Sequence, residues 1–158
     1  EKIIKEESLI KAYKDGNDKE ARWNMMMAST EGAMAFSKGL GAVHSMSHAT
    51  GANQELRLHH GTLNAVILPA VLEFNQNHVG NKYSRIARAM GKNDSINLAN
   101  EIRKLNENIG IPSGLAEMGV TEDMIPELVT HSITDPSNLT TPRLPNEEEW
   151  EKLFLESM

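Results

Sequence analysis

The chain consists of successive helical segments, because its apolar residues recur at spacings of three and four and no segment alternates strictly between apolar and polar residues. Gly and Pro separate the segments; Asp15-Gly16, for example, ends the first one. We therefore predict an all-α fold class with one domain over residues 1–158. The predicted helices cover about 1–14, 18–37, a stretch after Gly41 to 48, 61–74, 82–90, 95–108, 122–130 and 147–156.

The predicted helix 18–37 is apolar on nearly every side. Its middle reads Met25-Met26-Met27-Ala28-Ser29, which is typical of a buried helix, and the methionines there favour core filling over soft-metal binding. Asn17 followed by Glu20 predicts a capping box at its start.

Other helix boundaries carry similar signals. Asn146 and Glu149 predict a second capping box, and Asn93 and Thr121 are candidate caps. Pro69 lies inside the helix 61–74 and removes one backbone hydrogen bond, so a kink or a short first segment is expected there. Residues 134–145, rich in Pro, Thr and Ser, are expected to form an extended linker.

Composition excludes several function classes. Aromatic residues are only 4% of the chain, so Leu, Ile, Met, Ala and Val must build the core. A net charge of -6 argues against nucleic acid and against an anionic membrane surface as partners. No apolar run approaches the roughly 20 residues of a membrane span, and no signal peptide is visible. The absence of cysteine fits a cytoplasmic protein and leaves His and carboxylates to hold any metal.

Four of the six histidines lie in one short stretch: His44, His48, His59 and His60. His44 and His48 are four residues apart, so a helix would place them on one face, where they could share a metal ion. The zinc-protease pattern requires Glu after the first His, and Ser45 stands there instead; di-iron Glu-x-x-His pairs are also missing. The simpler interpretation is a hydrogen-bonded core histidine, which we keep for the isolated His78 and His131.

Two runs in this region, Gly39–His48 and His60–Asn75, resemble the signature of the iron-containing alcohol dehydrogenases, in particular the pattern His-Gly-x-x-Asn-Ala-x-x-Leu-Pro-x-Val. Gly110–Val120 and Asn138–Met158 resemble later segments of the same family. The resemblance implies the multi-helix C-terminal domain of the iron-dependent alcohol dehydrogenase / dehydroquinate synthase-like fold. It also implies a Rossmann-like N-terminal domain, and we expect that domain to precede residue 1.

The resemblance assigns roles to individual histidines. His44 and His60 match metal ligands of the family, which binds Fe²⁺ or sometimes Zn²⁺ through one Asp and three His. His48 matches a histidine beside the substrate and the nicotinamide, with a catalytic role. Spacing alone would instead have paired His44 with His48. The loop before His60 is about two residues longer than in many members, and His59 is expected to be a neighbour rather than a ligand.

The activity implied by the resemblance is hydride transfer between an alcohol and NAD or NADP, with the metal as Lewis acid. The nucleotide would be bound mainly by the missing domain. The Asp and the first His ligand of the metal are likewise expected before residue 1. We expect the chain alone to bind metal weakly and to turn over no alcohol. Its partners would be a small alcohol or aldehyde and other copies in a homo-oligomer. Two alternatives stay open: a zinc-dependent glycerol dehydrogenase-like sibling, or a non-catalytic helical module.

Overall fold

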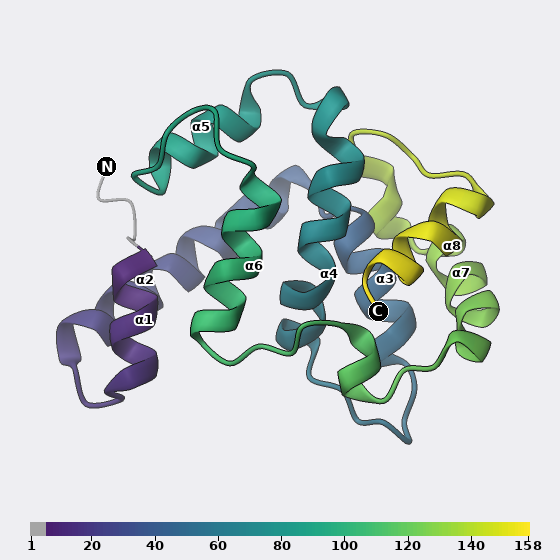
Figure 1. Ribbon diagram of the computed structural model, residues 1–158, viewed down its shortest axis with the longest axis horizontal. Helices are drawn as coiled ribbons and strands as arrows, with labels where there is room; N and C mark the ends of the chain where they lie inside the picture. The colour runs from purple at the N-terminus through teal and green to yellow at the C-terminus, as the bar shows by residue number, and fades with distance from the viewer. Residues whose placement is uncertain (1–5) are drawn as a thin grey trace. The chain divides into compact units, whose positions relative to one another are not determined.

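The computed structural model describes residues 6–158, and over that range it is helical and contains no strand (Figure 1). The predicted all-α fold class is therefore confirmed, while residues 1–5 of the first predicted helix lie outside the described residues. The α-helices are α1 Glu6–Lys14, α2 Lys19–Ala35, α3 Ala42–Gly51, α4 His60–Asn75, α5 Lys82–Ala89, α6 Leu98–Asn108, α7 Ile125–Thr134 and α8 Glu147–Glu156. Short 3-10 helices are η1 Phe36–Lys38, η2 Gln76–His78, η3 Leu115–Met118, η4 Glu122–Met124 and η5 Pro136–Thr140.

The predicted cap of α2 is wrong by one residue. Asp18, not Asn17, caps the helix, because its carboxylate accepts a hydrogen bond from the backbone N–H of Ala21 at 2.9 Å. The backbone N–H of Asn17 instead donates to the side chain of Asp15 at 2.8 Å, which forms the turn before the helix.

Of the two other predicted caps, Asn93 is misplaced, and Thr121 occupies the N-cap position of η4 without a side-chain bond. Helix α6 begins after Asn97, whose side chain accepts from the N–H of Asn100, whereas Asn93 forms a turn by accepting from Ser95. The capping box of α8 is confirmed: Asn146 accepts from the N–H of Glu149 at 2.9 Å, and Glu149 accepts in return from the N–H of Asn146 at 3.0 Å.

Helix α4 continues through Pro69 instead of ending there. A proline has no N–H, so the carbonyl four residues earlier, that of Ala65, loses its helical partner. The side chain of Asn106 on α6 replaces that partner, since its amide Nδ2 lies 2.7 Å from the Ala65 carbonyl oxygen. A neighbouring helix thus supplies the donor that the proline lacks.

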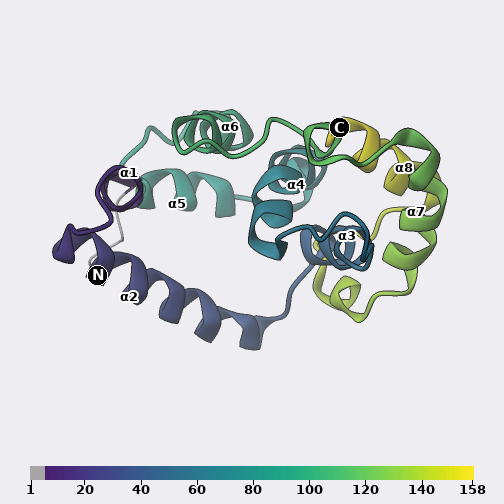
Figure 2. The same cartoon turned by 90° about the horizontal axis from the view of Figure 1, so that it is seen from below.

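The chain divides into two compact units. The first contains the residues up to Gly39 together with 81–96, and the second contains 40–80 and 97–158. The expectation of one domain over residues 1–158 stays a prediction. Within the second unit, α4 packs against α3, α6 and α8, and α7 packs against α3 and α8 (Figures 1 and 2).

The first unit does not bury α2 as predicted. Only Ala21 of α2 is buried, and the large side chains of Trp23, Met26 and Met34 are 62%, 64% and 72% exposed. Helix α1 packs on α2, where Asn24 donates to the hydroxyl of Ser8. At 1.5 Å per residue, α1 is about 13 Å long and α2 about 25 Å, so α1 covers only part of its partner.

The second unit has a continuous apolar core with Trp150 and Phe154 of α8 at 1% and 0% exposure. Met46 is buried there, as expected for a methionine that fills a core. The other fully buried members are aliphatic: Leu63, Ile67, Leu115 and Leu153. Within the described residues, no helix has the length and apolar character that crossing a membrane requires.

The C-terminus closes this core. The N–H of Leu115 donates to the carbonyl of Ser157 at 2.8 Å, so the last residues run against the segment before η3. A Cβ added at Gly114 would overlap the backbone carbonyl of Met158. The backbone of Gly114 is extended, with φ of -164°, so glycine is needed here for space alone.

Candidate metal centre

Three of the four clustered histidines bring their rings together where α3 meets α4. The ring centroids of His44 and His60 are 5.4 Å apart, those of His48 and His60 5.3 Å, and those of His44 and His48 5.8 Å. His44 and His48 share one face of α3 because they are four residues apart, and His60 is the first residue of α4. All three belong to the second unit.

The His60 ring is held from both sides. Its Nδ1 lies 2.9 Å from the hydroxyl of Ser47, and its Nε2 lies 3.1 Å from Nδ2 of Asn64, one turn further along α4. An amide nitrogen only donates, so Nε2 accepts and Nδ1 carries the ring hydrogen. Burial, and then the positive charge that His48 would carry, lower the pKa of His60. The ring is therefore kept neutral with the Nε2 lone pair directed at Asn64.

His44 directs its Nε2 to the same amide, with Nε2 3.5 Å from Nδ2 of Asn64. Its pKa is lowered by burial first and then by His60 and His48, against an opposing effect of Asp135. The carbonyl oxygen Oδ1 of Asn64 is buried and has no hydrogen-bond partner. Two neutral imidazoles thus converge on the Nδ2 end of one amide group, and the Oδ1 end of that group has no hydrogen-bond donor.

His48 has a different partner. Its ring stacks on that of His60 with an angle of 17° between the planes, and its Nδ1 lies 2.9 Å from Oδ2 of Asp135, just after α7. Burial opposes ionisation of Asp135, but hydrogen bonds from Ser137 and His48 outweigh it and lower the pKa of this carboxyl. The His48 side chain is 42% exposed, whereas that of Asp135 is 14% exposed.

His59 serves as a cap. Its Nδ1 accepts from the backbone N–H of Thr62 at 3.3 Å and lies 3.2 Å from the Thr62 hydroxyl, so the side chain satisfies one free donor at the start of α4. It is an unusual residue for this position, where Ser, Thr, Asp and Asn prevail. The doubled His59-His60 therefore combines a helix cap with a ring directed at the cluster.

The chemistry of the donors fits part of a metal site. Neutral imidazole nitrogens are good ligands for iron and zinc, and a hydrogen bond at the other ring nitrogen, as between His60 and Ser47, orients such ligands. Between residues 6 and 158, however, no group of three or more His, Asp or Glu side chains is placed to hold a metal ion. Within that range His44 and His60 therefore offer two imidazole donors without a third donor beside them.

Sequence reasoning missed Ser47, Asn64 and Asp135 as members of this site. Asn64 follows His60 by four residues, so helical spacing could have placed the two side chains together. Ser47 lies on α3 between His44 and His48, and neither spacing nor residue type distinguishes it. Asp135 is 87 residues from His48, and nothing local indicates that pairing.

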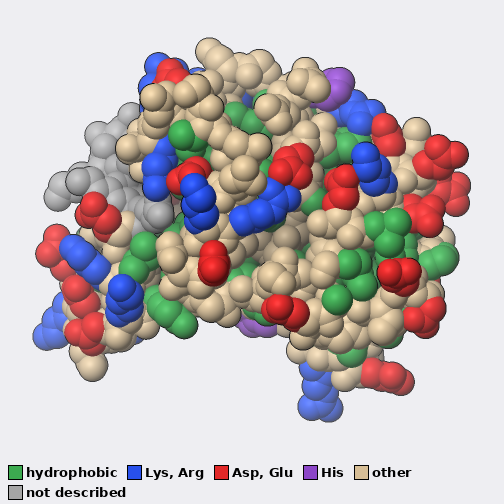
Figure 3. All heavy atoms as spheres, in the orientation of Figure 1, with side chains coloured by type: hydrophobic (Ala, Val, Ile, Leu, Met, Phe, Trp, Pro, Cys, Tyr) green, Lys and Arg blue, Asp and Glu red, His purple; other side chains and the backbone are tan. Residues whose placement is uncertain are grey.

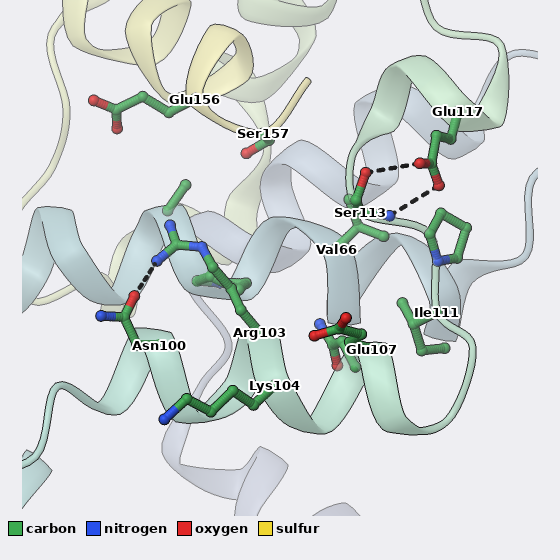
Figure 4. Close-up of a pocket in the computed structure, with 14 residues that line it drawn as sticks. Val66, Asn100, Arg103, Lys104, Glu107, Ile111, Ser113, Glu117, Glu156 and Ser157 are labelled. Atoms are coloured by element: carbon green, nitrogen blue, oxygen red, sulfur yellow. Dashed lines mark hydrogen bonds between the residues drawn. The ribbon is translucent and has the colours of Figure 1, made fainter.

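A separate groove of about 600 Å³ lies between α4, α6 and the C-terminus (Figure 4). Its cations are already paired: Arg103 with Glu73 at 2.6 Å and Lys104 with Glu101 at 2.7 Å. Figure 3 shows acidic and basic side chains intermixed over α6, so the surface favours neither sign of ligand. Since none of the described residues lining the groove is a histidine, the cluster between α3 and α4 is the better candidate site.

The all-helical fold, with histidines of α3 and α4 brought together, is that of a C-terminal helical domain found in one family of enzymes. The family described as "Fe-containing alcohol dehydrogenase family, C-terminal" matches residues 2–158. The chain belongs to the iron-containing alcohol dehydrogenase family, as its sequence motifs predicted.

Individual relatives agree with this assignment. A 4-hydroxybutyrate dehydrogenase of Cupriavidus necator is 41% identical over 155 residues, covering 94% of this chain and 41% of the relative. An NAD-dependent methanol dehydrogenase of Bacillus methanolicus is 38% identical over 147 residues, covering 87% of this chain and 38% of the relative.

Solved structures share the fold. A 1,3-propanediol oxidoreductase superposes with a TM-score of 0.91 at 31% identity, covering 97% of this chain and 42% of that structure. An alcohol dehydrogenase from Oenococcus oeni gives a TM-score of 0.90 at 28% identity, covering 97% and 42%. The chain thus spans about two fifths of the length of the relatives it matches.

Proposed function

We propose that this chain is the metal-holding domain of an NAD(P)-dependent alcohol dehydrogenase that interconverts a small primary alcohol and its aldehyde by hydride transfer. The observation that carries the proposal is the convergence of His44 and His60 on the Asn64 amide, at 3.5 and 3.1 Å, in a family of such enzymes. Two relatives are named for methanol and 1,3-propanediol, which are primary alcohols, and this supports that substrate class.

His44 and His60 would hold Fe²⁺ or Zn²⁺ through their Nε2 atoms. When bound, the ion would supply Lewis acidity, which lowers the pKa of an alcohol hydroxyl and polarises an aldehyde carbonyl. The protein's part is orientation: Ser47 fixes His60 from behind, and burial keeps both rings neutral and able to bind. The Asn64 amide would lose its contacts with the two Nε2 atoms when those atoms bind the metal ion instead.

His48 would stand beside the reacting groups as a catalytic residue that does not bind the metal. Its ring lies against His60, and its Nδ1 is already bonded to Asp135, so its Nε2 is the nitrogen that can contact a substrate. The relatives are longer than this chain by about three fifths of their own length. The corresponding part of a longer protein would bind the nicotinamide cofactor and supply the remaining metal ligands.

Two ligands rarely hold a divalent ion well, so we expect the chain Glu1–Met158 alone to bind Zn²⁺ weakly and to oxidise no alcohol. Calorimetric titration with Zn²⁺ measures this directly. One-site binding with sub-micromolar affinity would contradict the expectation, because it would require a complete site within these residues.

The ligand assignment is tested in the complete polypeptide that carries this sequence. His60→Ala should lower bound metal and alcohol oxidation together, with metal measured by mass spectrometry. His59→Asn is the matched control: asparagine also caps helices, so metal content and rate should both persist. If His60→Ala kept its metal and its rate, His60 would not be a ligand.

A further inference from the structure

Asp135 uses its two carboxylate oxygens for different purposes. Oδ1 accepts from the backbone N–H of Ser137 at 2.8 Å, which forms the turn after α7 and caps η5. Oδ2 lies 2.9 Å from Nδ1 of His48. Because the first bond fixes the carboxylate, the second fixes the imidazole.

The turn that carries Asp135 is itself attached to the helix that carries His48. The hydroxyl of Ser45 on α3 donates to Oδ1 of Asn138 at 2.6 Å, and Nδ2 of Asn138 donates to the carbonyl of Ser132 on α7. Ser45 and Ser132 are both fully buried. The distance between Asp135 and α3 is therefore set by a buried polar network and does not depend on the His48 contact alone.

The ring of His48 is consequently restrained on two sides. Oδ2 of Asp135 holds one edge, and the near-parallel ring of His60 lies against one face. An ionised carboxylate only accepts hydrogen bonds, so the hydrogen of a neutral His48 ring must sit on Nδ1. The other nitrogen, Nε2, is then left as an acceptor.

We propose that Asp135 is a positioning residue that fixes His48 in the Nδ1–H tautomer and presents its Nε2 as a hydrogen-bond acceptor for a substrate hydroxyl. The tautomer and ring orientation stand on the contacts alone. The substrate hydroxyl rests on the proposed function, because an alcohol is the group that would meet His48 there. A carboxylate in this place acts through the histidine and does not touch the substrate itself.

The test is the tautomer of His48 in the chain Glu1–Met158. Long-range ¹H–¹⁵N correlation spectra of a histidine-labelled sample, recorded near pH 8 where histidine is mostly neutral, distinguish the two ring nitrogens. We expect Nδ1 to be protonated, with the signals assigned by their loss in His48→Gln. Asp135→Asn should shift His48 to the Nε2–H form, because an amide can donate to Nδ1. Asp123→Asn, an exposed change on η4, should leave the tautomer as it is.

Each outcome decides the proposal. An Nε2–H tautomer in the unmodified chain would overturn it, and so would an unchanged tautomer in a folded Asp135→Asn variant. If that variant does not fold by circular dichroism, the spectrum of the unmodified chain decides alone. An Nδ1–H form that disappears in Asp135→Asn supports it.

Kinetics in the complete protein separate this proposal from the proposed function. Asp135→Asn should lower kcat about tenfold or more at unchanged metal content, and Asp135→Glu should recover part of the loss. If the complete protein oxidised no alcohol while the tautomer still depended on Asp135, the proposed function would fail and the positioning role would stand. If the complete protein oxidised alcohol but the tautomer did not depend on Asp135, the positioning role would fail and the proposed function would stand.

Discussion

Helices α2 and α4 are nearly equal in length, at 17 and 16 residues, but their side chains have opposite surroundings. α4 buries residues along its whole length, whereas α2 buries only Ala21. The reason is the number of neighbours: α4 has α3, α6 and α8 around it, and the packing partner of α2 within its unit is the shorter α1. Apolar composition makes burial favourable, but the helices that pack against a segment determine whether burial occurs.

The largest expected difference between the two helices is in core truncation. Leu63→Ala on α4 removes a side chain with 0% exposure and should lower the free energy of unfolding by about 2–5 kcal/mol. Met34→Ala on α2 should change it by less than about 0.5 kcal/mol. Urea unfolding measures both, with the buried Trp150 as fluorescent reporter after Trp23→Phe. If Met34→Ala lowered the free energy of unfolding by a comparable amount, α2 would be covered in solution, and the contrast in burial between α2 and α4 would be wrong.

A second contrast concerns glycines. Gly114→Ala places a methyl group on the backbone carbonyl of Met158, so we expect a loss of about 1–3 kcal/mol in thermal or urea unfolding. Gly16 precedes α2 and has open space around its Cβ position, so Gly16→Ala should be nearly neutral. Equal effects at the two positions would show that the C-terminus does not pack against Gly114 in solution.

A third prediction tests how α4 tolerates its proline. Asn106→Ala leaves the Ala65 carbonyl without a donor and should cost about 1 kcal/mol, because the group is only partly buried. Adding Pro69→Ala restores a backbone N–H at that position and should remove much of the cost. A double-mutant cycle by urea unfolding measures the coupling between the two changes. If the effects of Asn106→Ala and Pro69→Ala on stability were additive, Asn106 would not be replacing the backbone donor that Pro69 lacks.

Effects no larger than that of Asn106→Ala are expected at helix caps, and there α2 should agree with α8, a helix of the second unit. Asp18 and Asn146 both accept from the N–H three residues on at 2.9 Å, and replacement of either by Ala should cost about 1 kcal/mol. Faster amide hydrogen exchange at Ala21 and at Glu149 would report each loss. Asp18→Asn keeps a capping side chain and should leave exchange at Ala21 unchanged. If only one helix responded, neighbours would influence capping as well as burial.

The histidine cluster shows what sequence can predict. The spacing of His44 and His48 and the family motif around His60 both pointed to this region, and the rings do lie together. Their roles as ligands and catalytic residue stay predictions. Asp135 escaped notice because its pairing with His48 depends on a tertiary contact across 87 residues, which no local pattern records.

The errors have physical reasons too. Periodicity measures which residues are apolar and not what packs on them, so the predicted burial of α2 was wrong. Asn17 and Asp18 are both good capping residues, and only backbone geometry decides between neighbours. The hydrogen bond from Asn106 to the Ala65 carbonyl, which replaces the one that Pro69 cannot make, requires α6 beside α4. Sequence spacing cannot indicate that packing.

The cap formed by His59 has a consequence for how this region can evolve. The side chain of His59 caps α4 directly before its first residue, His60. The positions of His60 and Asn64 on the helix are therefore set by this cap and not by the length of the preceding loop. Residues can therefore be inserted or deleted between Ala52 and Leu58 while the spacing of the site is preserved. Because Leu56 and Leu58 pack on the core, such changes are expected at the exposed residues Gln54 and Glu55.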